Sequence, residues 1–293
     1  MEIGEIRAAE AAHANGRGRP ILRRGKQAAV GAVARMHRLL GRPAGLALPL
    51  TREAFFRRVD TRRSLEIGPF DNPVLRGDGV RYFDILGTEE LKDRSRRHGR
   101  ATSDVPAIDY VSPTGDLGIV PDRFATILSS HCIEHQPDLV RHLRSVEALL
   151  EPGGRYYVIC PDKRYCFDYF NGASSYDAVV AAFREGRTVH TPEMVRAHIE
   201  NTTHNDSLKH WLGRHGRPIV EDDASVVAVA DDSAARVAAG EYVDVHGWMF
   251  TPETFLSTLR RLIADGLVGL EIVSVTQTRF GAQEFFAELR KPG

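Results

Sequence analysis

The chain has 293 residues, of which 42% are hydrophobic and 27% charged, and its formal net charge is zero. These values are ordinary for a soluble globular protein and allow one large α/β domain, or one domain with an insertion. No run of about 18 apolar residues is present, so we expect no transmembrane helix. The three cysteines form no C-x-x-C pair. Their number and spacing argue against a disulfide framework and for a reducing, cytoplasmic compartment.

Positive charge is concentrated near the N-terminus, where residues 1–63 contain fourteen Lys or Arg and five Asp or Glu. Apolar residues between positions 21 and 40 recur at helical spacing, and GRPAG then ends the predicted helix. We therefore expect residues 1–59 to form a basic helical arm. The preferred interpretation is a solvated arm against an acidic body; weak contact with a membrane surface or polyanion is the alternative. We expect no nucleic-acid partner, although the arm could pack on a second copy in a homo-oligomer.

Predicted strands alternate with helices from Ser64 onward. An amphipathic helix is expected over residues 138–154, where a Pro-Gly-Gly sequence stops it. The alternation is typical of a parallel sheet that is covered by helices and joined by right-handed crossovers. The expected strands cover residues 64–68, 79–86, 107–111, 124–131 and 155–160.

The alternation is lost over residues 162–245, where apolar runs are short and His, Asn, Asp and Arg are frequent. We interpret this segment as an inserted region of helices, with a short hairpin, that forms a substrate lid. Regular order then returns with a helix over 251–267, for which Thr251 is a candidate N-cap. Two final strands, 270–278 and 284–291, predict an antiparallel hairpin at one edge of the sheet.

The strand ends hold the candidate binding residues, because ligands of open α/β sheets bind at the carboxyl ends of the strands. Glu66, Ile67 and Gly68 end the first strand, and Asp84 ends the second. A carboxylate in the position of Asp84 can accept hydrogen bonds from ribose hydroxyls, or can simply be a turn residue. The first turn lacks G-x-G-x-x-G, and Asp71 would repel a phosphate. A cationic sulfonium cofactor suits this turn better.

Three stretches together resemble the class I S-adenosylmethionine-dependent methyltransferases. LEIGPFDNP and VRYFD are similar to the first two motifs, and the stretch from Asp122 to Asp162 is similar to the fourth strand, its helix and the fifth strand. The resemblance covers residues 60–161 and 246–293. The first turn is similar to that of some bacterial members of the family that are associated with saccharide gene clusters. The family resemblance implies a Rossmann-like, doubly wound, mainly parallel seven-stranded sheet of order 3-2-1-4-5-7-6. Phe70 and Asn72 stand where the family usually has glycine.

The resemblance implies S-adenosyl-L-methionine as cofactor and assigns its contacts by position. Gly68 would let the methionine part approach the backbone, and Glu66 would hold either the turn or, through water, the amino group of the cofactor. Asp84 would bind the ribose. The expected cofactor-binding residues are Glu66, Ile67, Gly68, Phe70, Asp84, Ile85, Asp116, Leu117, Ser129 and Ser130.

The sequence SSHCIEH places His131 at the end of the fourth strand and His135 four residues later. Either histidine could act as the general base that methyl transfer to an alcohol requires, and His131 is preferred. A divalent metal held by His131, Glu134 and His135 is a weaker alternative, and we assign no metal ligand. Glu134 could instead only buttress the local helix.

The sequence therefore predicts a methyltransferase that acts on a small-molecule or saccharide-like acceptor, at oxygen. Lys163 and Arg164 could meet an anionic group of that acceptor, or form a solvated pair. A nicotinamide-dependent oxidoreductase and a non-catalytic binding module remain as alternatives. The missing glycines and the SSHCIEH segment disfavour the oxidoreductase.

Overall fold

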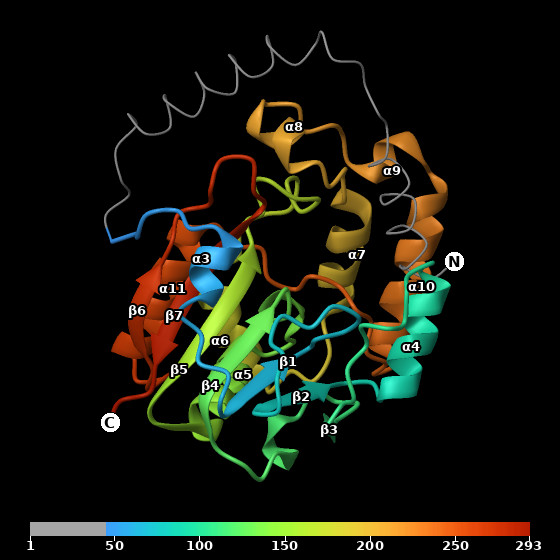
Figure 1. Ribbon diagram of the computed structural model, residues 1–293. Helices are drawn as coiled ribbons and strands as arrows, with labels where there is room; N and C mark the ends of the chain where they lie inside the picture. Colours follow the sequence, from blue (N-terminus) through green and yellow to red (C-terminus); the bar gives the residue numbers. More distant parts are fainter. Residues whose placement is uncertain (1–44) are drawn as a thin grey trace, which may run out of the picture.

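The computed structural model describes residues 45–293, so most of the expected basic arm, including the predicted helix over 21–40, lies outside the described residues. A seven-stranded sheet of order β3-β2-β1-β4-β5-β7-β6 forms the centre of the fold (Figure 1). Only β7 pairs antiparallel with its neighbours; the other pairings are parallel. This order confirms the predicted Rossmann-like α/β fold class.

The strands follow the predicted order with altered boundaries. The third is only two residues long, and the fifth starts earlier than expected, because the Pro-Gly-Gly stop of the preceding helix lies inside the extended segment. The strands are β1 (Ser64–Ile67), β2 (Val80–Asp84), β3 (Tyr110–Val111), β4 (Phe124–Ser130), β5 (Leu150–Pro161), β6 (Glu271–Val275) and β7 (Glu284–Arg290).

The helices include α3 with its predicted cap, since the Thr51 hydroxyl accepts from the backbone N–H of Ala54. Among residues 45–293, two are short 3-10 helices, η3 (Leu117–Ile119) and η4 (Ile133–His135). The α-helices are α3 (Arg52–Phe56), α4 (Thr88–Arg97), α5 (Leu139–Leu149), α6 (Tyr176–Glu185), α7 (Pro192–Asn201), α8 (Ser207–Trp211), α9 (Ile219–Asp222), α10 (Ser225–Ala238) and α11 (Pro252–Ala264). Among the described residues, no helix is both long enough and apolar enough to cross a membrane.

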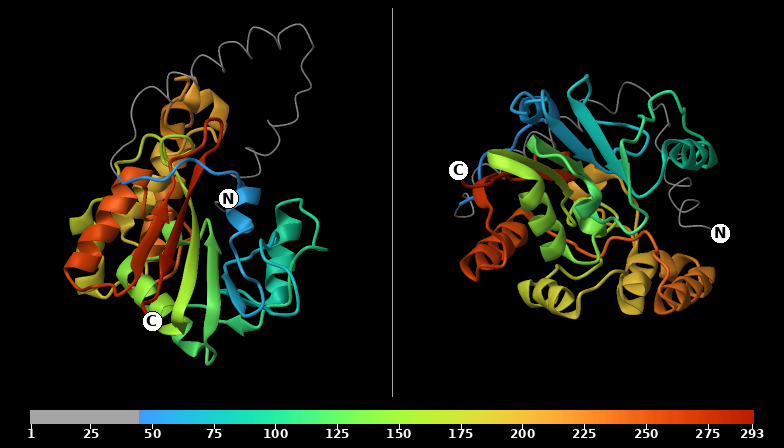
Figure 2. Two further views of the ribbon diagram at one scale, coloured as in Figure 1. Left: turned by 60° about the vertical axis from the view of Figure 1, so that its left-hand side comes forward. Right: turned by 90° about the horizontal axis from the view of Figure 1, so that it is seen from below.

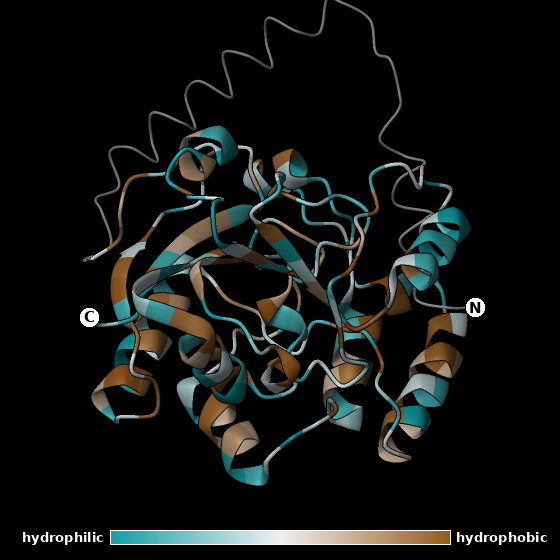
Figure 3. Cartoon of the chain, turned by 60° about the horizontal axis from the view of Figure 1, so that its bottom comes forward, coloured by the Kyte–Doolittle hydropathy of each residue, from teal (hydrophilic) through white to brown (hydrophobic). Residues whose placement is uncertain are grey.

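Both faces of the sheet are buried, because alternate residues of the central strands enter two different cores. Along β5, Tyr156 and Val158 pack into the larger core with α5, α6 and α11, whereas Tyr157 and Ile159 pack into the smaller one. Phe55 of α3 fills the smaller core and stacks on Phe286 with ring centroids 4.6 Å apart. Figure 2 shows α5, α6 and α11 on one face of the sheet and α3 on the other, and in Figure 3 brown hydrophobic segments run along the strands and the neighbouring helices.

Residues 162–245 form helices α6 to α10 rather than the expected helices with a hairpin. The sequence ASVVAVA, which looks like a strand, lies in α10 instead, because Val226, Ala230, Ala234 and Val237 recur at helical spacing on its buried side. Three of these residues, Val226, Ala230 and Val237, form a hydrophobic cluster with Val195 and Ile199 of α7. This cluster is separate from the main core. The helix α6 instead packs against α5 and α11.

Candidate functional site

A cavity of about 740 Å³ lies at the carboxyl ends of β1, β2, β4 and β5. The parallel register brings these ends to one edge, since Ile67 pairs with both Phe83 and Ser129. Tyr242, Asp244 and His246 line another part of the cavity, so the segment before α11 also contributes. Of the residues predicted for the site, ten line this cavity: Glu66, Ile67, Gly68, Phe70, Asp84, Ile85, Leu117, Ser130, His131 and His135.

Two predicted cofactor residues, Asp116 and Ser129, do not line the cavity. The Asp116 carboxylate accepts from the Gly118 N–H at 2.8 Å and so caps η3. Ser129 is fully buried, and its hydroxyl lies 2.6 Å from the Tyr156 hydroxyl. Strand alternation explains why Ser130 lines the cavity and Ser129 does not, because neighbouring residues of a strand point to opposite faces of the sheet. The expected contacts of Asp116 and Ser129 with the cofactor stay untested predictions.

The turn after β1 is held from within by Glu66. Its two carboxylate oxygens accept from the N–H groups of Val74 and Leu75 at 2.8 and 2.7 Å. Burial raises the pKa of Glu66 to about 7, although these hydrogen bonds act in the opposite direction. Gly68 follows with φ of 69°, a backbone conformation that favours glycine. Glu66 therefore fixes the loop that presents the Gly68 backbone to the cavity.

The predicted electrostatic role of Asp71 needs correction. Its carboxylate is 8% exposed, forms an ion pair with Arg100 at 3.2 Å and accepts from the Ser95 hydroxyl. A carboxylate compensated in this way adds little negative field to the cavity. The argument that Asp71 repels phosphate is therefore weaker than the sequence alone indicated.

Phe70 adopts φ of 47°, which is uncommon for a residue with a Cβ atom, and its ring lies at the cavity. The guanidinium carbons of Arg94 and Arg100 lie 5.4 and 5.8 Å from the ring centre. These cation–π contacts compensate for part of the backbone cost. The missing glycine of the first motif is thus replaced by an aromatic residue that forms part of the cavity wall.

Asp84 lies at the end of β2, 7% exposed, with Ile85 beside it on the cavity wall. The Asp84 carboxylate accepts from the Leu86 N–H at 3.1 Å. Burial raises its pKa above the usual value, against the lowering effect of backbone hydrogen bonds. Asp84 and Ile85 are thus placed as an acidic and an apolar group next to each other.

Within residues 45–293, His131 is the second non-glycine residue, after Phe70, with a positive φ, 51°, and it lies at the end of β4. Its Nε2 lies 2.9 Å from a carboxylate oxygen of Glu284, which also binds Arg52 through two hydrogen bonds. Burial would raise the pKa of Glu284, but the contacts with Arg52 and His131 outweigh it and lower the pKa to about 2. An ionised Glu284 can only accept, so Nε2 of His131 donates. In the neutral ring Nδ1 is then the proton acceptor.

The second predicted histidine, His135, faces a different carboxylate. Its Nδ1 lies 2.8 Å from Asp244, which also binds Arg94 at 2.6 Å. Its ring meets that of His246 edge to face, with centroids 4.6 Å apart. His135 is therefore held between two residues of the segment before α11.

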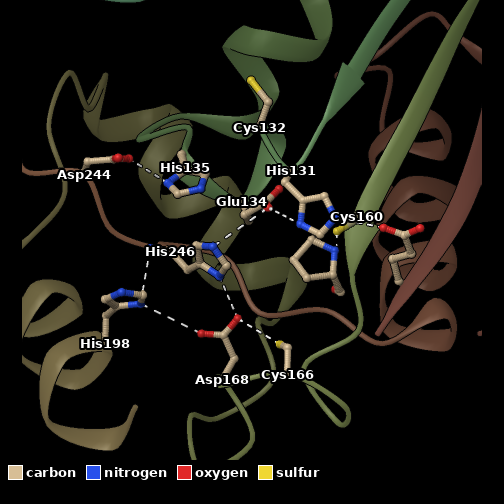
Figure 4. Close-up of polar contacts among 12 residues, drawn as sticks. His131, Cys132, Glu134, His135, Cys160, Cys166, Asp168, His198, Asp244 and His246 are labelled. Atoms are coloured by element: carbon tan, nitrogen blue, oxygen red, sulfur yellow. Dashed lines mark hydrogen bonds and ion pairs between the residues drawn. The ribbon is translucent and has the colours of Figure 1, made fainter. Parts of the chain in front are cut away.

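His246 belongs to a buried cluster in which its Nδ1 lies 2.6 Å from an oxygen of Asp168. The other Asp168 oxygen lies 3.8 Å from His198. Burial would raise the pKa of Asp168, but its contacts with the two histidines keep the pKa below its usual value. Figure 4 shows the chain of contacts that leads from His198 through Asp168 and His246 to Glu134.

Four polar residues of the inserted region do not line the cavity: Lys163, Arg164, Tyr169 and His215. Arg164 binds Asp162 at 2.6 Å, and the Lys163 ammonium donates to the Tyr169 carbonyl. The rings of Tyr169 and His215 stack with centroids 3.7 Å apart. These contacts organise the loop after β5 and the segment around α8.

Comparison with known proteins gives no family for this chain: no family model and no curated protein matches it. Solved structures with some likeness include three methyltransferases. The CcbJ methyltransferase from Streptomyces caelestis is 15% identical, with a TM-score of 0.41 over 89% of this chain and 96% of that one. An S-adenosylmethionine dependent methyltransferase from Mesorhizobium loti is 17% identical, with a TM-score of 0.38 over 82% and 98%.

The mitomycin 7-O-methyltransferase MmcR is 16% identical, with a TM-score of 0.36 over 78% of this chain. The match covers 48% of that protein, and a match to the CurJ carbon methyltransferase covers 52% of its chain. The chain thus spans about half the length of these two proteins. Likenesses at this level are not evidence for an activity.

Several residues at the site were missed by the sequence analysis. Arg52 and Glu284 hold His131, while Asp168, His198 and Asp244 support the other histidines. One local signal was available, since Asp244 stands two residues before His246 in YVDVH. The pairing of Glu284 with His131 has no local signal.

Proposed function

We propose that the chain is a methyltransferase that uses S-adenosyl-L-methionine and methylates a small-molecule or saccharide-like acceptor at oxygen. The observation that carries the proposal is the position of His131. It is held by Glu284 on the wall of the same cavity that Gly68 and Asp84 line. A proton acceptor and the predicted cofactor contacts therefore share one cavity.

The residues of the cavity suit this cofactor. A Cβ atom on Gly68 would have only the side chain of Cys132 within 4 Å, at 3.5 and 3.6 Å, so the backbone here is open to a ligand. The buried carboxylate of Asp84 can accept from ribose hydroxyls, with Ile85 and Leu117 as apolar neighbours for a base. Phe70 and Leu117 add further apolar surface.

When bound, the cofactor would supply an electrophilic methyl group. The part of the protein is then to orient the acceptor and to remove its proton. Nδ1 of His131 takes that proton, and the imidazolium that results is stabilised by Glu284 on Nε2. Glu134 lies 3.6 Å from Nδ1 and adds a second negative charge. Arg52 keeps Glu284 ionised and in position.

The domain division belongs to the same proposal. Residues 60–161 and 246–293 would form the methyltransferase core, 1–59 a basic arm, and 162–245 a lid over the acceptor. Two residues of the inserted region, Phe167 and Asn205, line the cavity, which is the observation behind the proposed lid. We also propose that the chain is cytoplasmic, that it assembles into a homo-oligomer, and that it belongs to the saccharide-cluster branch.

The test is a calorimetric titration of the purified chain with S-adenosylmethionine, S-adenosylhomocysteine and NAD. Binding of the first two supports the proposal. Binding of NAD alone would replace it with an oxidoreductase, and binding of none would favour a non-catalytic module.

The base is tested separately by His131→Ala, with His204→Ala as a control outside the cavity. We expect the first variant to lose ~100-fold or more in turnover while cofactor affinity stays within a few-fold. Undiminished turnover in His131→Ala would rule out His131 as the base.

A further inference from the structure

The side chain of Glu134 is in an unusual environment for a carboxylate. It is fully buried, at 0% exposure, in the 3-10 helix η4 behind the cavity wall. Within residues 45–293, neither of its oxygens accepts a hydrogen bond. A buried carboxylate without hydrogen bonds is costly, so its charge needs another compensation.

The nitrogens nearest to this carboxylate are at a distance that fits an intervening ion. Nε2 of His246 lies 3.9 Å from Oε1 of Glu134, and Nδ1 of His131 lies 3.6 Å from it. Both distances are too long for a hydrogen bond. Two ligands that each lie about 2.1 Å from one tetrahedral metal ion are about 3.4 Å apart, so small side-chain shifts bring these atoms to that spacing. The ligand atoms of Glu134, His135 and His246 all lie within 4.8 Å of one another.

Both histidines of this set are oriented from behind by a carboxylate. Nδ1 of His246 binds Asp168 at 2.6 Å, and Nδ1 of His135 faces Asp244 at 2.8 Å. In the His246 ring the other nitrogen, Nε2, faces the Glu134 carboxylate. This arrangement of carboxylate, histidine and metal fixes the tautomer of a ligand and strengthens its binding. Backbone hydrogen bonds hold the segment of His246 against η4, since the N–H groups of Gly247 and Trp248 donate to the Glu134 carbonyl.

We propose that Glu134, His135 and His246 bind one divalent transition-metal ion of the Zn²⁺ type. Two imidazoles and one carboxylate favour Zn²⁺ over Mg²⁺, which prefers oxygen ligands. This differs from the sequence-based alternative, because His246 replaces His131 as the third ligand. His131 thereby keeps Nδ1 for a proton.

His135 and His246 line the cavity, so three protein ligands leave the ion an open position toward it. An ion there would bind an oxygen of the acceptor and lower its pKa. This use of the ion rests on the proposed function, whereas the binding of the ion does not.

A second group, Asp168, His198 and His246, is close enough to be considered. In it the 2.6 Å contact between Asp168 and His246 is a hydrogen bond between two of the would-be ligand atoms. We therefore assign Asp168 as the residue that orients His246, rather than as a ligand of the ion. The two sets share His246 and differ in His135 and His198, which makes these two histidines a matched pair for a test.

The test measures metal binding directly, without substrate. The full chain is freed of metal by dialysis against a chelator, and Zn²⁺ or Mg²⁺ is added while bound metal and Tm are measured. We expect one Zn²⁺ per chain, a rise in Tm of several degrees, and much weaker Mg²⁺ binding. Wild-type protein that binds no Zn²⁺ stoichiometrically would overturn the proposal, even if it binds S-adenosylmethionine.

Variants then identify the ligands. Glu134→Gln and His135→Gln are expected to weaken Zn²⁺ binding ~100-fold or more, whereas His198→Gln changes it less than ~10-fold. Metal-free Glu134→Gln should be no less stable than the metal-free wild type, because it removes an uncompensated buried charge. A purely structural Glu134 would give the opposite result, a lower Tm with unchanged Zn²⁺ affinity. Loss of binding in His198→Gln alone would refute the assigned ligand set.

Discussion

Replacement of Gly68 by alanine separates the backbone role of this residue from its role in the cavity. Gly68 has φ of 69°, and an L-residue in this left-handed conformation costs about 1–2 kcal/mol of stability. The added Cβ atom would lie 3.5 Å from Sγ of Cys132, which is ordinary van der Waals contact. The protein itself therefore adds no steric penalty. The loss of unfolding free energy should stay at about 1–2 kcal/mol.

A bound cofactor would meet the new methyl group directly. Overpacking of a filled site costs about 1–3 kcal/mol, which corresponds to a loss in affinity of about 5- to 150-fold. The matched control is Gly266→Ala, where φ is 68° and no atom lies within 4 Å of the added Cβ. It should lose the same stability with no loss of affinity. Urea unfolding gives the stabilities, and calorimetric titration with S-adenosylhomocysteine gives the affinities. Equal affinities in Gly68→Ala and Gly266→Ala would refute the assignment of Gly68 to the cofactor.

Two further predictions concern the fold. Phe55→Ala should cost about 3–5 kcal/mol in urea unfolding, since this fully buried ring packs on Phe286 and Tyr157; a loss below about 1 kcal/mol would mean that α3 adds little to the core. His142 is buried beside Tyr156, and burial lowers its pKa to about 4, so the unfolded chain takes up the proton first. Stability should therefore fall as pH drops from 6.5 to 4, by up to about 3 kcal/mol, and unfolding of His142→Gln at both pH values should show a smaller difference. The same pH dependence in both proteins would contradict this.

The sequence by itself determined the sheet. Alternating apolar residues and helix caps are local signals, and the parallel arrangement follows from strand–helix alternation. The strand order itself was implied by the resemblance to the class I methyltransferases. The strand ends were predictable from the same alternation, so Gly68, Asp84 and His131 were correctly placed on one edge. The shortness of the third strand and the helical structure of α10 were not predictable from these local signals. Valine–alanine runs fit either structure, and only packing against α7 selects the helix.

Only the tertiary structure decided which groups support the site. Glu284 reaches His131 because β7 pairs antiparallel with β5, which places Glu284 opposite Pro161, while β4 pairs in parallel with β5. Asp168 and His246 meet because separate segments of the chain converge beside η4. Such contacts depend on the register of strands and the path of loops that are far apart in sequence. No periodicity records them, and so His246 could be assigned as a partner of Glu134, the residue that carries the metal proposal, only in the folded chain.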